Sequence, residues 1–213
     1  MTAQLLALFL GGYLVGSIPF GVLVGRACKG VDIRQYGSGN IGFSNALRVL
    51  GWKPAAMVFI ADALKGVAPV VASKVLMQAW HTPHADVWLL PLGLAPILGH
   101  SFSAFLKFTG GRAVTTTLGV LLGLCWQAAL IGLGIWLIVV AVTRYISLAS
   151  ILASASVPIY MVLAHRGREW IIFWVAIAAL VILRHIPNIK RLLANAETKI
   201  GERVELREEE PDK

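Results

Sequence analysis

Long apolar segments separated by short polar ones occupy most of this chain. Residues 3–25, 54–78, 87–106, 148–164 and 170–184 are rich in aliphatic and aromatic residues, and the first of these segments carries no charge. Their lengths are close to the roughly 20 residues with which a helix crosses a bilayer. The pattern predicts an all-α, polytopic helical membrane protein.

The run from Ala113 to Thr143 holds 31 residues without a charge. As one helix it would be about 46 Å long, against roughly 30 Å of hydrocarbon. We therefore expect a short helix over residues 113–123, a bend near residues 124–127 and a full span that ends at Thr143. This division gives about seven transmembrane helices, one of them too short to cross fully.

Lysine and arginine gather in particular loops, and positively charged loops stay in the cytoplasm. The loop of residues 26–53 holds five such cations, and residues 185–203 hold four. The sequence therefore predicts that the N-terminus lies outside and the C-terminus inside. The loop of residues 165–169 then lies outside although it carries cations, and this loop fits the orientation least well.

Composition supports a membrane protein. Hydrophobic residues make up 57% of the 213 residues and charged ones 14%, which excludes a soluble globular domain. We expect a single domain over residues 1–213, with an acidic, disordered tail at residues 202–213. The net charge of +8 is spread over loops between spans, so no nucleic-acid partner is predicted. Cys28 and Cys125 belong to no Cys-x-x-Cys motif, so neither a disulfide nor a metal site is expected.

The segment from Gly37 to Arg48 lies in the first cytoplasmic loop and reads Gly-Ser-Gly-Asn-Ile-Gly-Phe-Ser-Asn-Ala-Leu-Arg. Glycines leave backbone N–H groups free to converge on an anion, and the asparagines and arginine add donors and a positive charge. The segment therefore predicts a phosphate-binding loop at the membrane surface. The alternative is a loop that only turns the chain. The candidate ligands are Ser38, Gly39, Asn40, Gly42, Asn45 and Arg48.

A second polar cluster follows the third apolar segment. Gly110, Gly111 and Arg112 precede threonines at positions 115–117, where a helix is expected to begin. This order resembles an anion site at a helix N-terminus, because glycine amides and a cation meet there. Taken alone the signal is weak, since two glycines and an arginine recur by chance.

His185 and Asn188 follow the last apolar segment, and they could face the same pocket. Histidine titrates near neutral pH, so His185 is a candidate to take a proton. The neighbouring Lys190 and Arg191 are better explained as cationic anchors at the membrane surface.

Two pairs of titratable residues need separate interpretation. Asp62 and Lys65 lie three positions apart within a predicted span, and they form either a structural ion pair or a support for the site. His81 and Asp86 match the His-x4-Asp signature of a large acyltransferase class. We exclude that match because Pro83 interrupts any helix between them and because the loop lies on the outer face.

Four motifs, in the same order, resemble a known family. They are Gly-Ser-Gly-Asn-Ile-Gly-x-x-Asn-x-x-Arg at 37–48, Gly-His-x-Phe-x-x-Phe-Leu-x-Phe-x-Gly-Gly at 99–111, Arg-Tyr-Ile-Ser-Leu-Ala-Ser at 144–150 and Glu-x-Lys-Ile-Gly at 197–201. Together they resemble the acyl-phosphate-dependent glycerol-3-phosphate acyltransferases of bacteria (PlsY). The resemblance implies an enzyme of the bacterial plasma (inner) membrane with a cytoplasmic active site. Such an enzyme moves a fatty acyl group from acyl phosphate to the 1-hydroxyl of glycerol 3-phosphate, giving lysophosphatidic acid for phospholipid synthesis.

The resemblance also implies roles for residues. Ser38, Gly39 and Asn40 would bind the phosphate of acyl phosphate, whereas Arg48, Ser147, His185 and Asn188 would hold glycerol 3-phosphate. Our candidate catalytic residues are His185, Arg48 and Arg112. Our candidate substrate-binding residues are Ser38, Gly39, Asn40, Gly42, Asn45, Gly110, Gly111, Ser147, Asn188, Glu197 and Lys199.

The expected partners are acyl phosphate, glycerol 3-phosphate and membrane lipids, without a cofactor or a metal, and a monomer is favoured. Acyl phosphate is already an activated anhydride, and no Ser-His-Asp or Cys-His set is visible. We therefore expect no covalent acyl-enzyme.

Several positions depart from the family pattern. Arg112 and Ala113 stand where the family usually has lysine and glycine, and the Cβ of Ala113 restricts its φ. Phe43-Ser44 replaces Ala-Thr, Ser103 replaces a proline and Asn195 replaces a glycine. Two alternatives remain open: a family relative with another acyl acceptor, and a small membrane transporter. A transporter would concentrate polar residues at the membrane midplane, whereas here most of them lie at cytoplasmic ends.

Overall fold

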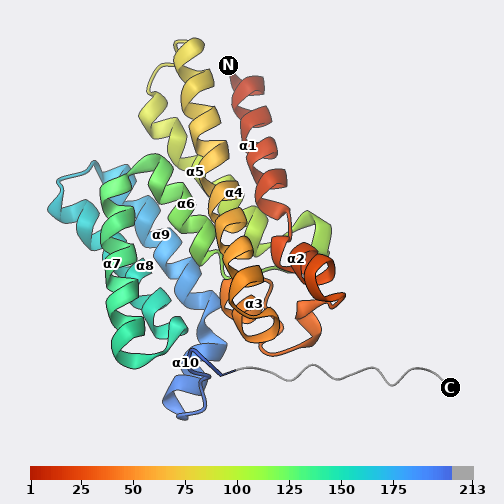
Figure 1. Cartoon of the computed structure of the whole chain (residues 1–213). Helices are drawn as coiled ribbons and strands as arrows, with labels where there is room; N and C mark the ends of the chain where they lie inside the picture. Colours follow the sequence, from red (N-terminus) through yellow and green to blue (C-terminus); the bar gives the residue numbers. More distant parts are fainter. Residues whose placement is uncertain (203–213) are drawn as a thin grey trace.

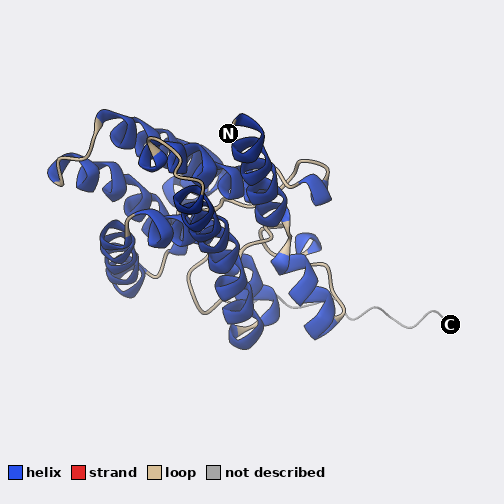
Figure 2. Ribbon diagram, turned by 90° about the horizontal axis from the view of Figure 1, so that it is seen from above, coloured by secondary structure: helices blue, strands red, loops and turns tan. Residues whose placement is uncertain are grey.

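The computed structural model describes residues 1–202, and every regular element in this part of the chain is a helix (Figures 1 and 2). The predicted disorder of residues 202–213 falls outside the described residues, except for Glu202. In order, the elements are α1 (Thr2–Ser17), α2 (Phe20–Lys29), η1 (Ile33–Gln35), α3 (Phe43–Leu50), α4 (Trp52–Ala79), α5 (Ala85–Ser101), η2 (Ala104–Leu106), α6 (Val114–Leu124), α7 (Trp126–Thr143), α8 (Ile146–Leu163), α9 (Arg168–Arg184) and α10 (Ile186–Leu193).

The described chain contains five segments that are long and apolar enough to cross a membrane, and a sixth if α9 and α10, which meet at 58°, count as one. The shorter apolar helix α6 ends at Leu124, and α7 begins at Trp126. The predicted division of the run from Ala113 to Thr143 is therefore confirmed. The all-helical, multi-span fold is also confirmed, whereas seven crossings and their orientation stay predictions.

The first predicted span, residues 3–25, is divided between α1 and α2. The break lies at Ile18 and Pro19, because proline has no N–H to donate and disfavours a helical conformation in the residue before it. The freed carbonyl of Ile18 accepts a hydrogen bond from Lys65 Nζ at 2.8 Å. The carbonyl of Ser17 accepts one from Ser103 Oγ at 2.6 Å. Polar side chains of other helices thus satisfy the backbone at the break, as the bilayer requires.

The helices form two flanks (Figure 1). Helices α7, α8 and α9 stand side by side on one flank, and α1, α4 and α5 pack together on the other. Helix α6 connects the flanks, because it packs on both α4 and α7. Glycines permit the closest crossings. A Cβ on Gly66 of α4 would lie 2.2 Å from the Thr116 carbonyl oxygen, and one on Gly119 of α6 would lie 2.1 Å from that of Ala63. Such close approach is how membrane helices gain packing energy without a hydrophobic driving force.

Two elements at the end opposite the N-terminus were not predicted as helices (Figure 1). Helix α3 is amphipathic and buries Ala46, Val49 and Leu50 against Ile33 and the start of α4. Helix α10 begins one residue after His185, with Pro187 in its first turn, where a missing N–H is tolerated. Both are too short and too polar for the span pattern to reveal them.

Candidate active site

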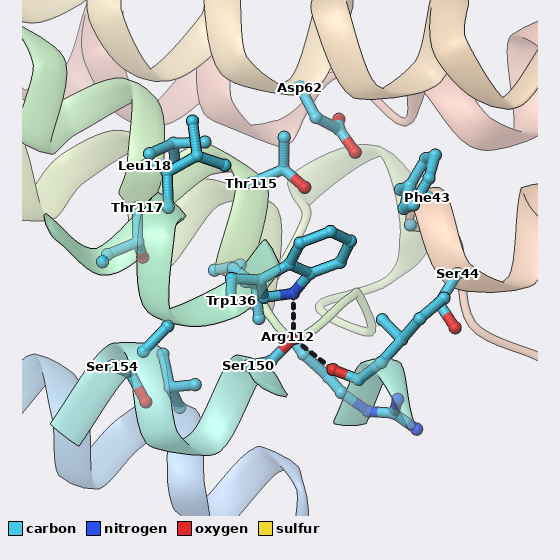
Figure 3. Close-up of a pocket in the computed structure, with 18 of the residues that line it drawn as sticks. Phe43, Ser44, Asp62, Arg112, Thr115, Thr117, Leu118, Trp136, Ser150 and Ser154 are labelled. Atoms are coloured by element: carbon cyan, nitrogen blue, oxygen red, sulfur yellow. Dashed lines mark hydrogen bonds between the residues drawn. The ribbon is translucent and has the colours of Figure 1, made fainter. Parts of the chain in front are cut away.

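A cavity of about 600 Å³ opens among α3, α4, α6, α7, α8 and α9. One end is polar, and the remainder is lined mainly by aliphatic and aromatic side chains of the spans, with Thr117, Ser150 and Ser154 among them (Figure 3). Trp136 of α7 lies across the cavity wall and donates from Nε1 to Ser150 Oγ of α8 at 3.2 Å. The polar and charged residues that line the cavity are Asn40, Ser44, Asp62, His100, Arg112, Thr115, Thr117, Ser147, Ser150, Ser154 and His185.

The glycine-rich loop before α3 lies at the polar end, but its amides are largely used within the loop. The N–H of Ser38 donates to Asn45 Oδ1 at 2.9 Å, and that of Gly42 donates to Asn40 Oδ1 at 2.9 Å. Gly39 donates to the Tyr36 carbonyl at 3.1 Å and has a φ of 68°, which favours glycine. Our prediction that the amides of Ser38, Gly39 and Gly42 are free for an anion is therefore wrong for this conformation, because side chains of the loop occupy them.

Asn45 fixes this loop. It is fully buried, its Nδ2 donates to the carbonyls of Ile33 and Tyr36 at 2.8 and 3.2 Å, and its Oδ1 accepts from Ser38. The loop also packs tightly on α2, since a Cβ on Gly21 would lie 1.8 Å from the Ile41 carbonyl oxygen. Asn45 is therefore a positioning residue, and it leaves Asn40 and Ser44 as the polar side chains of this segment that face the cavity.

The backbone of the second glycine segment, Gly110 and Gly111, is also engaged by other residues. Arg184 donates to the carbonyls of Ser101, Gly110 and Gly111 at 3.0, 2.8 and 2.9 Å. The N–H of Gly111 donates to the His100 carbonyl at 3.0 Å, and a Cβ on Gly111 would lie 2.0 Å from His100 Nε2. The two glycines thus shape the approach to Arg112, and the predicted role of the Gly111 amide in anion binding is not realised here. Sequence reasoning missed Arg184, whose only signal was a cation at the end of an apolar segment.

Arg112 lines the cavity and has no hydrogen bond or ion pair with any residue of the described chain, 1–202. Burial, reinforced by the positive charge of Arg191, lowers the pKa of Arg112 to about 10. The next residue, Ala113, is buried and left-handed, with φ at 57° and ψ at 15°. The conformation that glycine adopts freely is therefore required here of an alanine.

His185 follows α9 directly, is 2% exposed and lines the cavity. Its Nδ1 lies 2.7 Å from the Val181 carbonyl oxygen. Because a carbonyl only accepts, Nδ1 carries the proton, and Nε2 is left as an acceptor. This tautomer suits a group that takes a proton from a hydroxyl.

Residues 194–202, which we name the C-terminal strap, fold back over the polar end. Glu197 of the strap is buried. Its Oε1 accepts hydrogen bonds from Ser147 Oγ at 2.8 Å and from Asn188 Nδ2 at 2.7 Å. Its Oε2 accepts one from Arg191 Nε at 2.7 Å. Burial opposes ionisation, but these three hydrogen bonds together lower the pKa of Glu197. The carboxylate therefore occupies a position with three donors that an anion could also use.

The strap also takes up Arg48 and Lys199. Arg48 is 8% exposed and donates from Nη2 to the Thr198 carbonyl at 3.2 Å, and burial lowers its pKa. Lys199 is exposed and lies 5.5 Å from the centre of the Tyr145 ring. Of the predicted site residues, Asn40, Gly42, Arg112, Ser147 and His185 line the cavity. The others, Ser38, Gly39, Asn45, Arg48, Gly110, Gly111, Asn188, Glu197 and Lys199, are not among its lining residues.

Asp62 and Lys65 form a buried ion pair at 2.8 Å, with His100 Nδ1 3.7 Å from the same carboxylate oxygen. Asp62 and His100 also line the cavity. The structural ion pair is therefore confirmed, and a role of the pair in supporting the site stays a prediction. Because the two charges within the span pair with each other, they need no transport role to explain them.

His81 and Asp86 lie far from this chemistry. Both are exposed, in or beside the turn between α4 and α5, and neither lines the cavity. Figure 1 places this turn at the end of the molecule opposite α3 and α10. The geometry agrees with the exclusion of the His-x4-Asp match.

Comparisons with known proteins agree on one family. The family model described as glycerol-3-phosphate acyltransferase matches residues 6–195. A relative named glycerol-3-phosphate acyltransferase from Synechococcus sp. (strain JA-2-3B'a(2-13)) is 43% identical over 203 residues, which cover 95% of this chain and 98% of that protein. A relative of the same name from Desulforamulus reducens is 41% identical over 196 residues, covering 92% and 95%.

Two crystal structures are similar in fold. PlsY (YgiH), an integral membrane glycerol 3-phosphate acyltransferase, in its glycerol 3-phosphate form has a TM-score of 0.85 at 37% identity, covering 93% of this chain and 96% of that one. Its lysophosphatidic acid form has a TM-score of 0.82 at 36% identity, with the same coverage.

Proposed function

This chain belongs to the glycerol-3-phosphate acyltransferase family, and from that membership we infer that it is a multi-pass membrane enzyme that transfers a fatty acyl group to glycerol 3-phosphate. The product is lysophosphatidic acid, the first intermediate of phospholipid synthesis. The resemblance of the four sequence motifs to this family is thereby confirmed.

The observation that carries the proposal is the polarity of the cavity. A cationic, hydrogen-bonding end that includes Arg112 and His185 continues into an apolar groove between spans. An amphiphile with an anionic head and a long hydrocarbon tail matches this division. Acyl phosphate is such a molecule, and we take it as the acyl donor.

The reaction needs two anions held together. The 1-hydroxyl oxygen of glycerol 3-phosphate forms a bond to the acyl carbon, and the bond from that carbon to the phosphate oxygen breaks, releasing inorganic phosphate. Positive charge from Arg112 and Arg48 offsets the repulsion between the two phosphates and stabilises the departing one. The hydroxyl proton passes to Nε2 of His185 or to the phosphate that leaves.

The remaining candidates act around these groups. Asn40 contributes an amide to the donor's phosphate, and Ser147 and Asn188, which now hold Glu197, contribute donors to glycerol 3-phosphate. Ser38, Gly39, Asn45, Gly110 and Gly111 hold the two loops in place. Lys199 of the strap adds positive charge at the entrance for the soluble substrate.

The proposed location is the bacterial inner membrane, with the polar end of the cavity in the cytoplasm. The loop of residues 26–53 and the region after α9, which border this end, carry eight of the sixteen lysines and arginines of residues 1–202, in line with the positive-inside rule. One domain, acting as a monomer, contains all the groups named above.

The test is the choice of donor. Purified protein is incubated with glycerol 3-phosphate and, separately, acyl phosphate, acyl-CoA or acyl carrier protein, and lysophosphatidic acid is measured. Only acyl phosphate should give product, and His81→Ala and Asp86→Ala should leave the rate nearly intact. A tenfold loss of rate in either variant, roughly 1.4 kcal/mol of transition-state stabilisation, would make His81 and Asp86 a candidate catalytic pair again.

A further inference from the structure

The apolar part of the cavity ends at one level on four helices. Its lining residues furthest from the polar end are Leu121 on α6, Ala129 on α7, Val157 on α8 and Trp174 on α9. All four are buried and belong to one hydrophobic cluster, which continues behind them. The groove therefore has a closed end made of a single packed layer.

The depth of the groove follows from helix geometry. His185 at the polar end and Trp174 at the closed end are eleven positions apart along α9, and Val140 and Ala129 are eleven apart along α7. At 1.5 Å per residue, both give a depth of about 16 Å. An extended chain advances roughly 1.2 Å per bond, as three backbone bonds span 3.3–3.6 Å, so roughly 13 bonds fit.

We propose that Trp174 is the end wall that sets the acyl-chain length this enzyme prefers. The inference rests on the proposed function, since it takes the groove to hold the acyl chain. Trp174 is the largest of the fully buried side chains, at 1% exposure, and it lines the cavity. Its Nε1 has no hydrogen-bond partner in the described chain, whereas the N–H of a buried tryptophan usually finds one.

The groove has another outlet, between α4 and α7. Ile60 and Leu137 line the cavity there and remain 58% and 55% exposed, whereas the residues at the closed end are buried. A chain longer than the groove must leave through this side opening and expose methylenes to lipid in a bent conformation. Chains that end at Trp174 avoid that distortion, so the preference falls gradually with added length.

Gly132 offers a change in the opposite direction. It lies on α7 and lines the cavity about one turn nearer the polar end than Ala129. A Cβ there would meet only the Ala153 carbonyl oxygen, at 3.7 Å. A larger side chain at this position therefore has room and shortens the groove by about 4.5 Å, or roughly four bonds.

The experiment measures kcat/KM for acyl phosphates of 10 to 18 carbons in Trp174→Ala, Trp174→Phe, Gly132→Leu and, as a matched control, Trp88→Ala on α5. Trp174→Ala should raise the C18-to-C14 ratio by about fourfold or more, the value of one buried methylene. Gly132→Leu should shift the optimum to shorter chains by about four carbons. Trp174→Phe, which keeps an aromatic wall, and Trp88→Ala should keep the wild-type profile.

An unchanged profile in folded Trp174→Ala and Gly132→Leu would overturn the end wall while leaving the acyltransferase function standing. If Trp174→Ala does not fold, Gly132→Leu decides alone. If the wild type converts no acyl phosphate, the proposed function fails, and chain binding is tested directly with brominated acyl phosphates. The fluorescence of Trp174 is the difference between the wild type and Trp174→Phe. Bromine near the chain end should quench this fluorescence, and bromine near the head should not. Equal quenching by both would overturn the proposal.

Discussion

Ala113 has a left-handed backbone directly after Arg112, and its Cβ makes that conformation unfavourable by about 1–2 kcal/mol. Ala113→Gly removes this strain but increases the freedom of the unfolded chain, which offsets about 0.4–1 kcal/mol. We expect the free energy of unfolding in detergent to rise by about 0.5–1 kcal/mol. Ala72→Gly, in the helical backbone of α4, should lower it instead, and the two variants changing in the same direction would contradict the strain at Ala113.

Substitution by lysine should affect the enzyme differently at Arg48 and at Arg112. Arg48 is buried and already donates to the strap, so a lysine there loses the planar fork that can bind Thr198 and a phosphate together. Arg48→Lys should raise the KM for glycerol 3-phosphate by about tenfold or more. Arg112 has no partner among residues 1–202 and supplies a point charge, so Arg112→Lys should keep much of the activity.

Both variants are assayed at matched ionic strength, because salt screening could imitate either effect. A silent Arg48→Lys together with an inactive Arg112→Lys would reverse the assigned roles. Correct insertion of each variant is checked by its yield as a monodisperse species in detergent.

At the scale of elements, the Asp62–Lys65 pair joins α4 to the break between α1 and α2. Its side chains are 1–2% exposed, and Lys65 also donates to Ile18. Lys65→Met leaves a buried carboxylate without its partner, and it should lower the free energy of unfolding by about 3–5 kcal/mol. The double variant Asp62→Asn with Lys65→Met should lower it less. Additive losses in this double-mutant cycle would show that the pair does not interact.

The lengths of the apolar runs predicted the helical segments well, including an interruption near residues 124–127, which the structure has at Cys125. It was less informative where polar contacts decide the conformation. The break at Pro19 lies inside an uncharged run, and its stabilising partners Lys65 and Ser103 are 47 and 86 positions away in sequence. Short helices α3 and α10 are held by contacts with neighbouring elements, which no local pattern encodes.

The same reason explains the incomplete picture of the site. Glycine content and family motifs identified the two loops, but which of their backbone N–H and C=O groups are free depends on the side chains that reach them. Asn45 takes the Ser38 amide, and Arg184 takes the carbonyls of Gly110 and Gly111. Composition suggests that a loop could bind an anion, and only the fold shows which donors are already engaged.

At the scale of the whole molecule, the testable feature is the orientation. His84, in the turn between α4 and α5, and Asn195, in the C-terminal strap, are both exposed. Figure 1 shows that turn and helix α10, which the strap follows, at opposite ends of the molecule. In a background without Cys28 and Cys125, a membrane-impermeant thiol reagent should label His84→Cys in intact cells and Asn195→Cys only after lysis. Labelling of both from the same side would overturn the predicted topology.

The side opening between α4 and α7 decides which concentration governs the reaction. Ile60 and Leu137 border this opening and remain exposed to the surrounding lipid. A donor that enters there arrives by two-dimensional diffusion, so its rate of capture follows its mole fraction in the leaflet and not its amount per volume of solution. Diluting the bilayer with inert lipid should therefore slow the reaction at constant bulk donor, and the single-chain product returns directly to the monolayer that supplied its precursor.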